Sequence, residues 1–332
     1  MIRGTASGKV ILFGEHAVVH GVPALAVGID RGATAAATPV TEGPSTLTVR
    51  EWNVTVRDDG VDTAPLARSL RDLIEVTRAE QRAAGEPPVG SMHVEAAAEL
   101  PPGGGLGCSA AIGVAVARAL DPSASADVIA ARVMAWERVF HGNPSGVDAA
   151  VSARGGCVQF QRGAAVPIER VRLTTPLQLC IGHTGIASST KTMVDGVASL
   201  LERKPETTRK TFDAIHTVVK NARLAIEAGD TRAIGQLLDL NQMLLSGLFV
   251  STPEIEQLCA TARTAGALGA KLTGAGGGGC VVALVDDATH AQAVLAAWKK
   301  DGFDGFCATV GDGPRAVSMG KGAVTSPAES AP

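Results

Sequence analysis

The spacing of apolar and polar residues divides the chain into strand-like and helix-like segments. In the first half, apolar residues alternate with polar or small ones over 46–57 and 91–100, and apolar runs cover 4–13 and 24–29. Both patterns predict β-strands. The segment 64–84 instead repeats its apolar residues every three or four positions, which predicts an amphipathic helix.

Helix-like segments are more frequent in the rest of the chain, and good start signals support them. Pro253 stands at the first position of one predicted helix, and Asp230 is expected to cap another. We expect helices over 110–120, 125–139, 205–228, 230–246 and 253–265, and strands over 157–160, 177–182 and 281–285. This mixture predicts an α+β fold of two fused domains.

The sequence contains no sharp linker between the two predicted domains. We place the boundary near Val171, which gives an N-terminal domain over 1–171 and a C-terminal domain over 172–321. The remaining residues, 322–332, are rich in Pro, Ala and Ser. That composition favours a disordered tail.

Two glycine-rich segments lie far apart in the chain, at 101–111 and 274–279. Glycine lets backbone N–H groups approach a phosphate and turn toward it, so the pair predicts two walls of one anion site. A flexible linker is the alternative for 274–279, but the strand-like run that follows favours a loop within a folded site. Ser109 stands where a helix begins, and we expect it both to cap the helix and to hold a phosphate oxygen or a metal ion.

Neither glycine-rich segment matches the common nucleotide-binding motifs in full. Residues 105–110 satisfy the relaxed dinucleotide pattern G-x-G-x-x-A, but the following helix leads into another helix rather than into a strand. A Walker A loop ends in Gly-Lys-Ser/Thr, and neither segment does so. The segments therefore predict binding of nucleotide phosphates by a different design.

Composition and charge argue against several other classes of protein. The net charge is −3 and aromatic residues make up only 3% of the 332 residues, which disfavours nucleic acid and acidic membranes as partners. No apolar run reaches the length of a membrane span. Residues 2–8 are too short and polar for a signal peptide, and the six cysteines form no C-x-x-C pair. We therefore expect a cytoplasmic protein with reduced thiols.

Several charged residues lie in apolar runs or at the ends of predicted elements, where functional groups are often found. Lys9 lies in an apolar strand and must either reach water or meet an anion. Glu15 and His16 follow a glycine at a strand end, and Glu137 lies late in a helix, where a carboxylate favours a partner cation. Asp148 follows a turn, where capping is the alternative role. With the glycine-rich segments, this set predicts an ATP-dependent small-molecule kinase.

Five segments of the chain carry a resemblance to a known family. Residues 9–26, 102–111, 141–148, 183–194 and 273–280 are similar to the motifs of mevalonate kinases, in the GHMP kinase superfamily. The run Gly-Glu-His-Ala-Val-Val-His-Gly is the specific part, because galactokinases carry Gly-Glu-His-Thr-Asp-Tyr there and homoserine kinases lack it. The resemblance implies an N-terminal domain like ribosomal protein S5 domain 2 and a ferredoxin-like C-terminal domain.

The resemblance also implies roles for individual residues. Asp148 would orient or deprotonate the C5 hydroxyl of mevalonate. Lys9 would lie beside Asp148, hold it ionised and stabilise charge on the γ-phosphate of ATP. Ser109 and Glu137 would hold Mg²⁺.

Further residues would bind the two substrates. Mevalonate would be held by Glu15, His16 and Thr190, with Gly274 and Ala275 in the loop that closes over the site. The loop that cradles the ATP phosphates would comprise Pro102, Gly103, Gly104, Gly105, Leu106, Gly107, Cys108, Ser109 and Ala110. The rival interpretations are another GHMP kinase, a non-catalytic nucleotide sensor on the same fold, and an NAD-dependent enzyme. A homodimer is left open.

The chain departs from the family pattern at two positions. Ala149 follows Asp148 where the family often has Asn, and Cys108 stands where the family usually has Ser. Because Cys108 lies at a helix start near Lys9, we expect a lowered pKa for its thiol and reaction with iodoacetamide. The alternative is that Cys108 packs under the loop as a small apolar group and stays inert.

Overall fold

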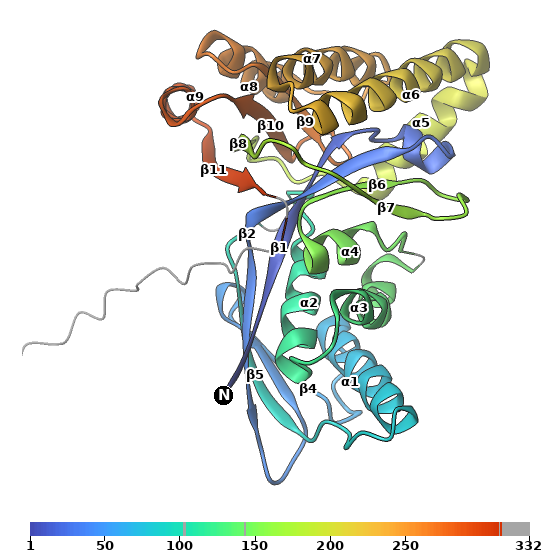
Figure 1. The fold of residues 1–332 in the computed structure, drawn as a ribbon, viewed down its shortest axis with the longest axis vertical. Coiled ribbons are helices and arrows are strands. Elements are labelled where there is room, and N and C mark those ends of the chain that lie inside the picture. Colours follow the sequence, from blue (N-terminus) through green and yellow to red (C-terminus); the bar gives the residue numbers. More distant parts are fainter. Residues whose placement is uncertain (102–103, 143, 312, 314–332) are drawn as a thin grey trace, which may run out of the picture.

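The computed structural model describes residues 1–101, 104–142, 144–311 and 313. Pro102, Gly103 and the predicted tail over 322–332 therefore lie outside the described residues. Two β-sheets with their own helices make up the described part (Figure 1). This arrangement confirms the predicted α+β class.

The larger sheet has seven strands, built around a long central pair. They are β1 (Ile2–Phe13), β2 (Ala24–Pro39), β3 (Thr46–Val49), β4 (Val54–Arg57), β5 (Met92–Ala98), β6 (Cys157–Phe160) and β7 (Ile168–Val171). Their order is β4-β3-β5-β2-β6-β7, with β1 paired to β2, and every pair except β3–β5 is antiparallel. The start of β2 pairs with β6 and its end pairs with β5.

Helices cover one face of this sheet in two layers (Figure 1). They are α1 (Pro65–Ala83), α2 (Cys108–Leu120), α3 (Ala126–His141) and α4 (Val147–Arg154). The helices α2 and α4 pack on β1 and β2, while α1 and α3 pack on each other further out. A Cβ at Gly4 would lie 2.0 Å from the carbonyl oxygen of Ala115, so glycine is needed for α2 to approach β1 this closely.

The smaller sheet has the predicted ferredoxin-like arrangement. Its strands are β8 (Leu177–His183), β9 (Gly269–Thr273), β10 (Cys280–Val285) and β11 (Asp304–Val310). They are all antiparallel in the order β11-β8-β10-β9, so the fourth strand lies beside the first and the third lies beside the second. The helices of this half are α5 (Thr190–Arg203), α6 (Pro205–Ala228), α7 (Thr231–Gly247), α8 (Pro253–Thr264) and α9 (Ala288–Lys300).

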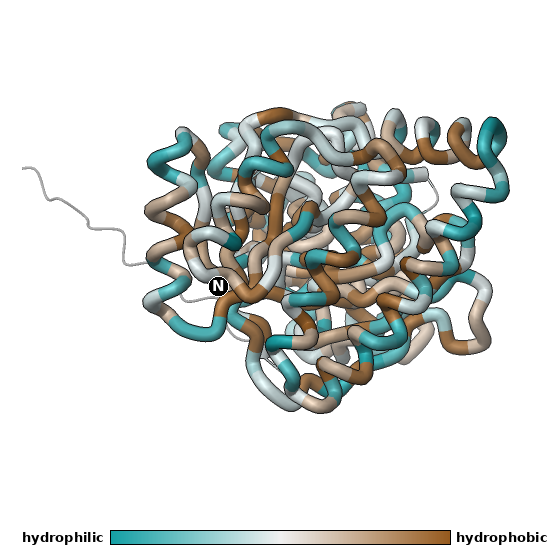
Figure 2. The backbone as a smooth tube through the Cα atoms, turned by 90° about the horizontal axis from the view of Figure 1, so that it is seen from above, coloured by the Kyte–Doolittle hydropathy of each residue, from teal (hydrophilic) through white to brown (hydrophobic). Residues whose placement is uncertain are grey.

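Local sequence accounts for where several of these helices begin. Asp230 accepts a hydrogen bond from the Ala233 N–H, and Thr252 accepts one from the Ile255 N–H. Hydrophilic and hydrophobic residues alternate around the turns of the outer helices (Figure 2), as expected when one face packs on a core. No helix of the described residues is long and apolar enough to cross a membrane.

The structure corrects two strand predictions. Residues 46–57 form a hairpin rather than one alternating run, because a short 3-10 turn (Arg50–Trp52) and Asn53, with φ +49°, separate β3 from β4. The strand predicted over 24–29 continues to Pro39 as β2. The alanine-rich part of β2 has weak strand propensity by itself, and pairing with β1 and β5 on either side holds it extended.

Side-chain contacts join the two sheets. Asp30 at the middle of β2 accepts a hydrogen bond from the Thr309 N–H of β11 at 2.8 Å, and the Arg31 guanidinium lies 4.6 Å from the ring centre of Phe306. The larger sheet ends at Val171 and the smaller begins at Leu177. The domain boundary near Val171 stays a prediction.

Candidate active site

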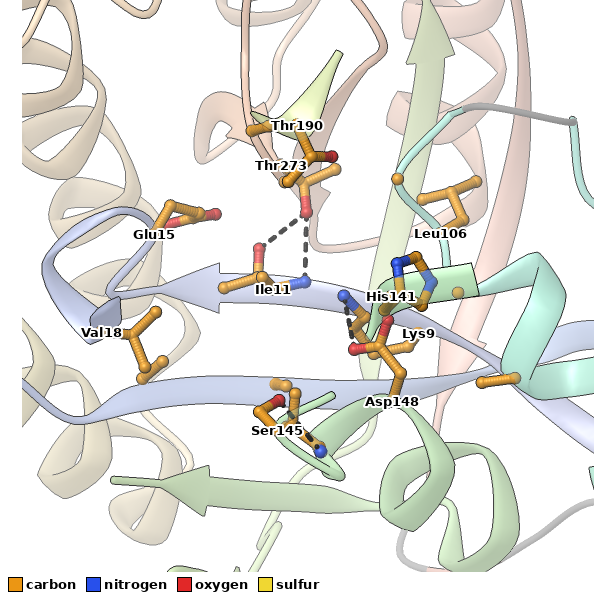
Figure 3. Close-up of a pocket in the computed structure, with 18 of the residues that line it drawn as sticks. Lys9, Ile11, Glu15, Val18, Leu106, His141, Ser145, Asp148, Thr190 and Thr273 are labelled. Carbon is orange, nitrogen blue, oxygen red and sulfur yellow. Dashed lines mark hydrogen bonds and ion pairs between the residues drawn. The ribbon is translucent and has the colours of Figure 1, made fainter. Parts of the chain in front are cut away.

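A cleft of about 530 Å³ lies where the two halves of the chain meet. Its lining combines β1, both glycine-rich loops, the start of α4 and the start of α5 (Figure 3). The two loops adjoin each other, because a Cβ at Gly105 would lie 3.7 Å from Gly274 Cα. The prediction that they form walls of one site is therefore confirmed as a matter of geometry.

The first glycine-rich loop is tied directly to β1. Its Leu106 carbonyl accepts a hydrogen bond from the Lys9 N–H at 2.9 Å, which fixes the loop above the strand. Gly105 and Gly107 adopt φ values of +73° and +70°, a region that favours glycine. The chain enters α2 at Cys108, so its first turn faces the cleft.

The second loop, 274–279, follows β9 and is held by the segment after α7. Gly276 has φ +74°, and a Cβ there would lie 2.2 Å from the Val250 carbonyl oxygen. Thr273, the last residue of β9, both donates to the Ile11 carbonyl oxygen and accepts from the Ile11 N–H, at 3.0 and 3.1 Å (Figure 3). The loop is therefore anchored to β1 at its base.

Lys9 and Asp148 form an ion pair in the cleft. Lys9 Nζ lies 3.0 Å from Asp148 Oδ1, and the exposed fractions of the two side chains are 6% and 32% (Figure 3). Asp148 is the second residue of α4 rather than part of a turn, and Gly146 with φ +84° precedes that helix. No side chain caps α4, so the capping alternative for Asp148 is wrong.

A second cluster of polar side chains joins α2 to α3. The Ser109 hydroxyl donates to Glu137 Oε1 at 2.7 Å and accepts from Trp136 Nε1–H at 3.2 Å. His141 Nε2 lies 3.6 Å from Glu137 Oε2. Burial raises the pKa of Glu137, against the hydrogen bond from Ser109. Ser109 is already inside the helix and caps nothing, so that half of its prediction is wrong.

This group has the chemistry of a site for a hard divalent cation. Hydroxyl and carboxylate oxygens are the ligands that Mg²⁺ prefers. Glu137 is buried and carries a raised pKa, and a nearby cation would favour its charged form. The residues present therefore fit Mg²⁺.

Glu15 and His16 lie at the opposite end of the cleft. Glu15 is 1% exposed and is ion-paired with Lys271 of β9. His16 donates from Nε2 to the Ala275 carbonyl oxygen at 2.7 Å. Burial lowers the pKa of His16, which favours the neutral ring; in that ring Nε2 carries the proton donated to Ala275, and Nδ1 is an acceptor.

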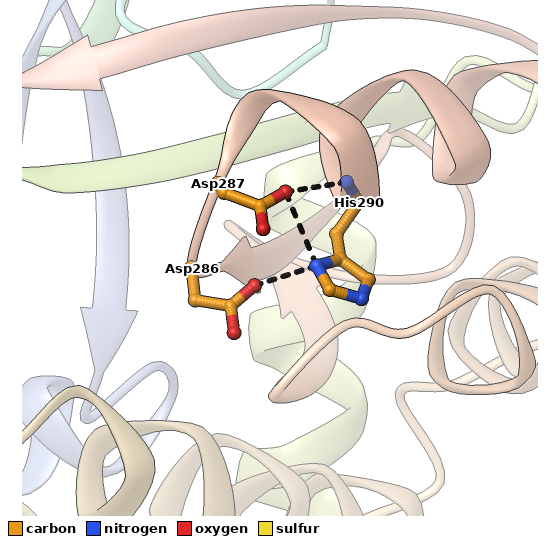
Figure 4. Close-up of side chains that lie close together, drawn as sticks. All are labelled: Asp286, Asp287 and His290. Carbon is orange, nitrogen blue, oxygen red and sulfur yellow. Dashed lines mark hydrogen bonds and ion pairs between the residues drawn. The ribbon is translucent and has the colours of Figure 1, made fainter.

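One further cluster, Asp286, Asp287 and His290, lies at the start of α9 (Figure 4). Asp287 caps this helix by accepting from the His290 N–H at 2.8 Å, and His290 Nδ1 lies 2.8 Å from Asp286 Oδ1. None of the three lines the cleft. Helix capping and a surface His–Asp pair account for this arrangement.

Two family models match the chain. GHMP kinases N terminal domain matches residues 71–156, and GHMP kinases C terminal matches residues 222–304. The first range includes α2, α3 and the Lys9 partner Asp148, and the second includes the glycine-rich loop at 274–279.

Two relatives of known name show the family within this group. The mevalonate kinase of Thermococcus gammatolerans is 33% identical over 307 residues, which cover 86% of this chain and 90% of the relative. The mevalonate kinase of Methanothermobacter thermautotrophicus is 35% identical over 299 residues, with 86% and 92% covered. This chain belongs to the mevalonate kinase family.

Solved structures of mevalonate kinases have the same fold. The L. major mevalonate kinase in complex with R-mevalonate superposes with a TM-score of 0.78 at 28% identity, covering 93% of this chain and 96% of that one. The Methanococcus jannaschii mevalonate kinase gives 0.78 at 24% identity, with 93% and 98% covered. The predicted two-domain GHMP kinase fold is confirmed.

All the residues predicted for the site that fall in the described part of the chain line the cleft. They are Lys9, Glu15, His16, Gly104, Gly105, Leu106, Gly107, Cys108, Ser109, Ala110, Glu137, Asp148, Thr190, Gly274 and Ala275. Pro102 and Gly103 lie outside the described residues. Thr190 is the exposed first residue of α5.

Several polar residues in or next to the cleft were not among the predicted site residues. Arg162 and Thr273 line the cleft, and Lys271 lies beneath it. Lys271 carried the same signal as Lys9, a lysine within an apolar strand. Arg162 follows β6 in a polar stretch and carried no signal.

The lowered pKa predicted for the Cys108 thiol is wrong in direction. Burial, with a further contribution from the charge of Glu51, raises the pKa of the Cys108 thiol to about 11. Cys108 is half-buried and packs against the hydrophobic core. Burial therefore outweighs the helix terminus, and the alternative of an inert apolar thiol is favoured.

Proposed function

We propose that this chain transfers the γ-phosphoryl group of ATP to the C5 hydroxyl of (R)-mevalonate, forming 5-phosphomevalonate and ADP. The observation that carries the proposal is the Lys9–Asp148 ion pair, 3.0 Å long, in a cleft that also contains Ser109 and Glu137. Phosphoryl transfer depends on positioning and on electrostatic stabilisation, and these residues can supply both.

Asp148 and Lys9 would act at the reacting hydroxyl. The Asp148 carboxylate is part-exposed to the cleft and can accept a hydrogen bond or a proton from an alcohol. Lys9 is almost fully buried and can stabilise negative charge as it develops on the transferred group.

Ser109 and Glu137 would hold Mg²⁺, and residues 104–107 with the first turn of α2 would bind the ATP phosphates. The backbone N–H groups at the start of a helix suit a phosphate. When bound at Ser109 and Glu137, Mg²⁺ would neutralise part of the negative charge of the ATP phosphates.

The remaining polar residues of the cleft suit a small hydroxy acid. Arg162 lines the cleft, and no ion pair is described for it within the residues that the structure covers, so its charge is available to a carboxylate. The Nδ1 atom of His16 is buried without a hydrogen-bond partner among the described residues and can accept from a hydroxyl. Val18 and Val19 provide an apolar wall.

The proposal is tested by an ADP-release assay over a panel of acceptors. We expect turnover with (R)-mevalonate and at most a small fraction of that rate with phosphomevalonate, galactose and homoserine. Faster turnover with any other member of the panel would assign the chain to a different substrate. An absence of ADP release from all of them would support the non-catalytic alternative.

A further inference from the structure

A lysine is buried completely beneath the cleft. Lys271, in the middle of β9, is 0% exposed, and its Nζ donates to Glu15 Oε1 and to the Leu272 carbonyl oxygen. The other carboxylate oxygen of Glu15, Oε2, accepts from Asn241 Nδ2 of α7 at 3.3 Å. Both oxygens of Glu15 are therefore occupied by protein groups.

Ion pairs with this degree of burial are unusual. Burial raises the pKa of Glu15 and lowers that of Lys271, while their mutual attraction opposes both shifts. A buried pair of this kind often stabilises a protein no better than apolar residues of similar size would. Its presence beside the cleft therefore suggests a role in local geometry.

The residue that follows Glu15 has a strained backbone. His16 has φ +61° and ψ −52°, and the Ala17 N–H donates to the Glu15 carbonyl oxygen at 2.7 Å, which makes a tight γ-turn centred on His16. A non-glycine residue persists in this region only when its surroundings hold it there. The side chain of Glu15 anchors one side of the turn, and the bond from His16 to Ala275 anchors the other.

Both partners that hold the γ-turn, Lys271 and Ala275, belong to one short stretch of chain. Lys271 and Ala275 lie on either side of Thr273, which is itself bonded to Ile11 of β1. The end of β9 thus holds the γ-turn at two points and β1 at a third. The γ-turn places the ring of His16 in the lining of the cleft.

We infer that Lys271 is a positioning residue, which acts through Glu15 to hold His16 in the geometry that binds the acceptor substrate. Glu15 is then a support for the γ-turn rather than a ligand of the substrate. This inference rests on the proposed function, because its readout is the KM for mevalonate. It also separates Glu15 from His16, which the sequence assigned to the same role.

The test compares Lys271→Met, which keeps length and removes charge, with the double variant Lys271→Met/Glu15→Gln. The single change leaves a buried carboxylate unpaired, so we expect a lower Tm and a KM for mevalonate raised by about ten-fold or more, comparable to losing one good polar contact. The KM for ATP should stay within about two-fold, because the ATP loop is tied to Lys9 instead. The double variant should regain most of the Tm and keep the raised KM for mevalonate.

A matched control is the buried pair Arg132–Asp121, whose nitrogen and oxygen lie 2.7 Å apart with both side chains 6% exposed. Neither residue lines the cleft. Asp121→Asn should lower the Tm without changing either KM. A rise in its KM for mevalonate similar to that of Lys271→Met would show that the effect is general loosening.

A second comparison asks whether Lys271 acts through His16. In a His16→Ala background, adding Lys271→Met should leave the KM for mevalonate unchanged, because the positioned ring is already absent. Another ten-fold rise there, or full recovery of KM together with Tm in the double variant, would overturn the inference. Inactivity of the unmodified enzyme on mevalonate would instead refute the proposed function, and with it the basis of this inference.

Discussion

Lys9 Nζ lies 3.0 Å from Asp148 Oδ1, although the two residues are 139 positions apart in the chain (148 − 9). Lys9 is brought there by β1, whose backbone also bonds to the first glycine-rich loop through Leu106. Asp148 is brought there by α4, which packs on the same strand. One strand therefore sets the distance between the phosphate loop, the lysine and the carboxylate.

Glu137 should make the metal-free protein less stable as the pH rises. Burial raises its pKa in the folded state, so the folded protein holds this proton more tightly than the unfolded chain. Its contribution is most favourable below about pH 4, the ordinary range of a Glu carboxyl, and is lost as the pH rises through the folded-state pKa. Glu137→Gln, measured by Tm in EDTA, should match wild type near pH 4 and exceed it at pH 8.

Added Mg²⁺ provides the internal control for that comparison. With Mg²⁺ and ATP, the wild-type protein should gain more stability than Glu137→Gln does, because only the carboxylate gains from a cation. An unchanged Tm difference between the two proteins across pH would mean that burial does not raise the pKa of Glu137 in the folded protein.

The Mg²⁺ requirement should depend on both Ser109 and Glu137. Ser109→Ala and Glu137→Gln each remove an oxygen ligand suited to a hard cation, so each should need more Mg²⁺ for half-maximal activity at saturating ATP and mevalonate. Midpoints equal to that of wild type in both variants would remove these residues from the metal site.

Arg162 should act mainly on binding of the acceptor. Arg162→Gln removes a charge that lines the cleft, and hydrogen bonds to charged groups contribute about 1.5–3 kcal/mol. We expect the KM for mevalonate to rise by roughly ten-fold or more, with kcat and the KM for ATP changing much less. Arg172→Gln, an exposed arginine just after β7 and outside the cleft lining, serves as the matched control. Equal effects of the two changes would assign the loss to general surface charge.

Cys108 should react slowly with alkylating agents at neutral pH. Its raised pKa of about 11 leaves little thiolate, so its rate of iodoacetamide labelling should rise about ten-fold per pH unit between pH 7 and 10. The exposed Cys307 should be modified first. Cys108→Ser should keep full activity. Peptide mapping that finds Cys108 labelled before Cys307 at pH 7.5 would contradict this order.

The motifs of the sequence predicted much of the site because they record local chemistry. Lys9 in an apolar strand, Ser109 at a helix start and Asp148 after a turn all carried local signals, and the structure brings them to one cleft. Most helices were predicted because caps such as Asp230 and Thr252 fix their starts. These features depend on residues within a few positions of each other.

The features that sequence missed depend on distant partners. Lys271 pairs with Glu15, which is 256 positions away in the chain. The spacing of apolar residues around Lys271 indicates that it is buried, but it does not identify the residue with which it pairs. The end of β2 is alanine-rich and is extended only because β1 and β5 flank it. Cys108 was assigned a lowered pKa from its helix terminus, whereas the packing of the folded core decides the direction.

The most direct test of the account is the kcat of Asp148→Asn with (R)-mevalonate, measured alongside the affinity for ATP. The change keeps the shape of the side chain and removes the charge at the reacting hydroxyl. We expect kcat to fall by roughly 10²–10⁴-fold, the range typical of general-base catalysis, with the Kd for ATP within a few-fold of wild type. A variant that keeps more than about a tenth of the wild-type kcat would contradict the assignment of the Lys9–Asp148 pair as the reacting centre.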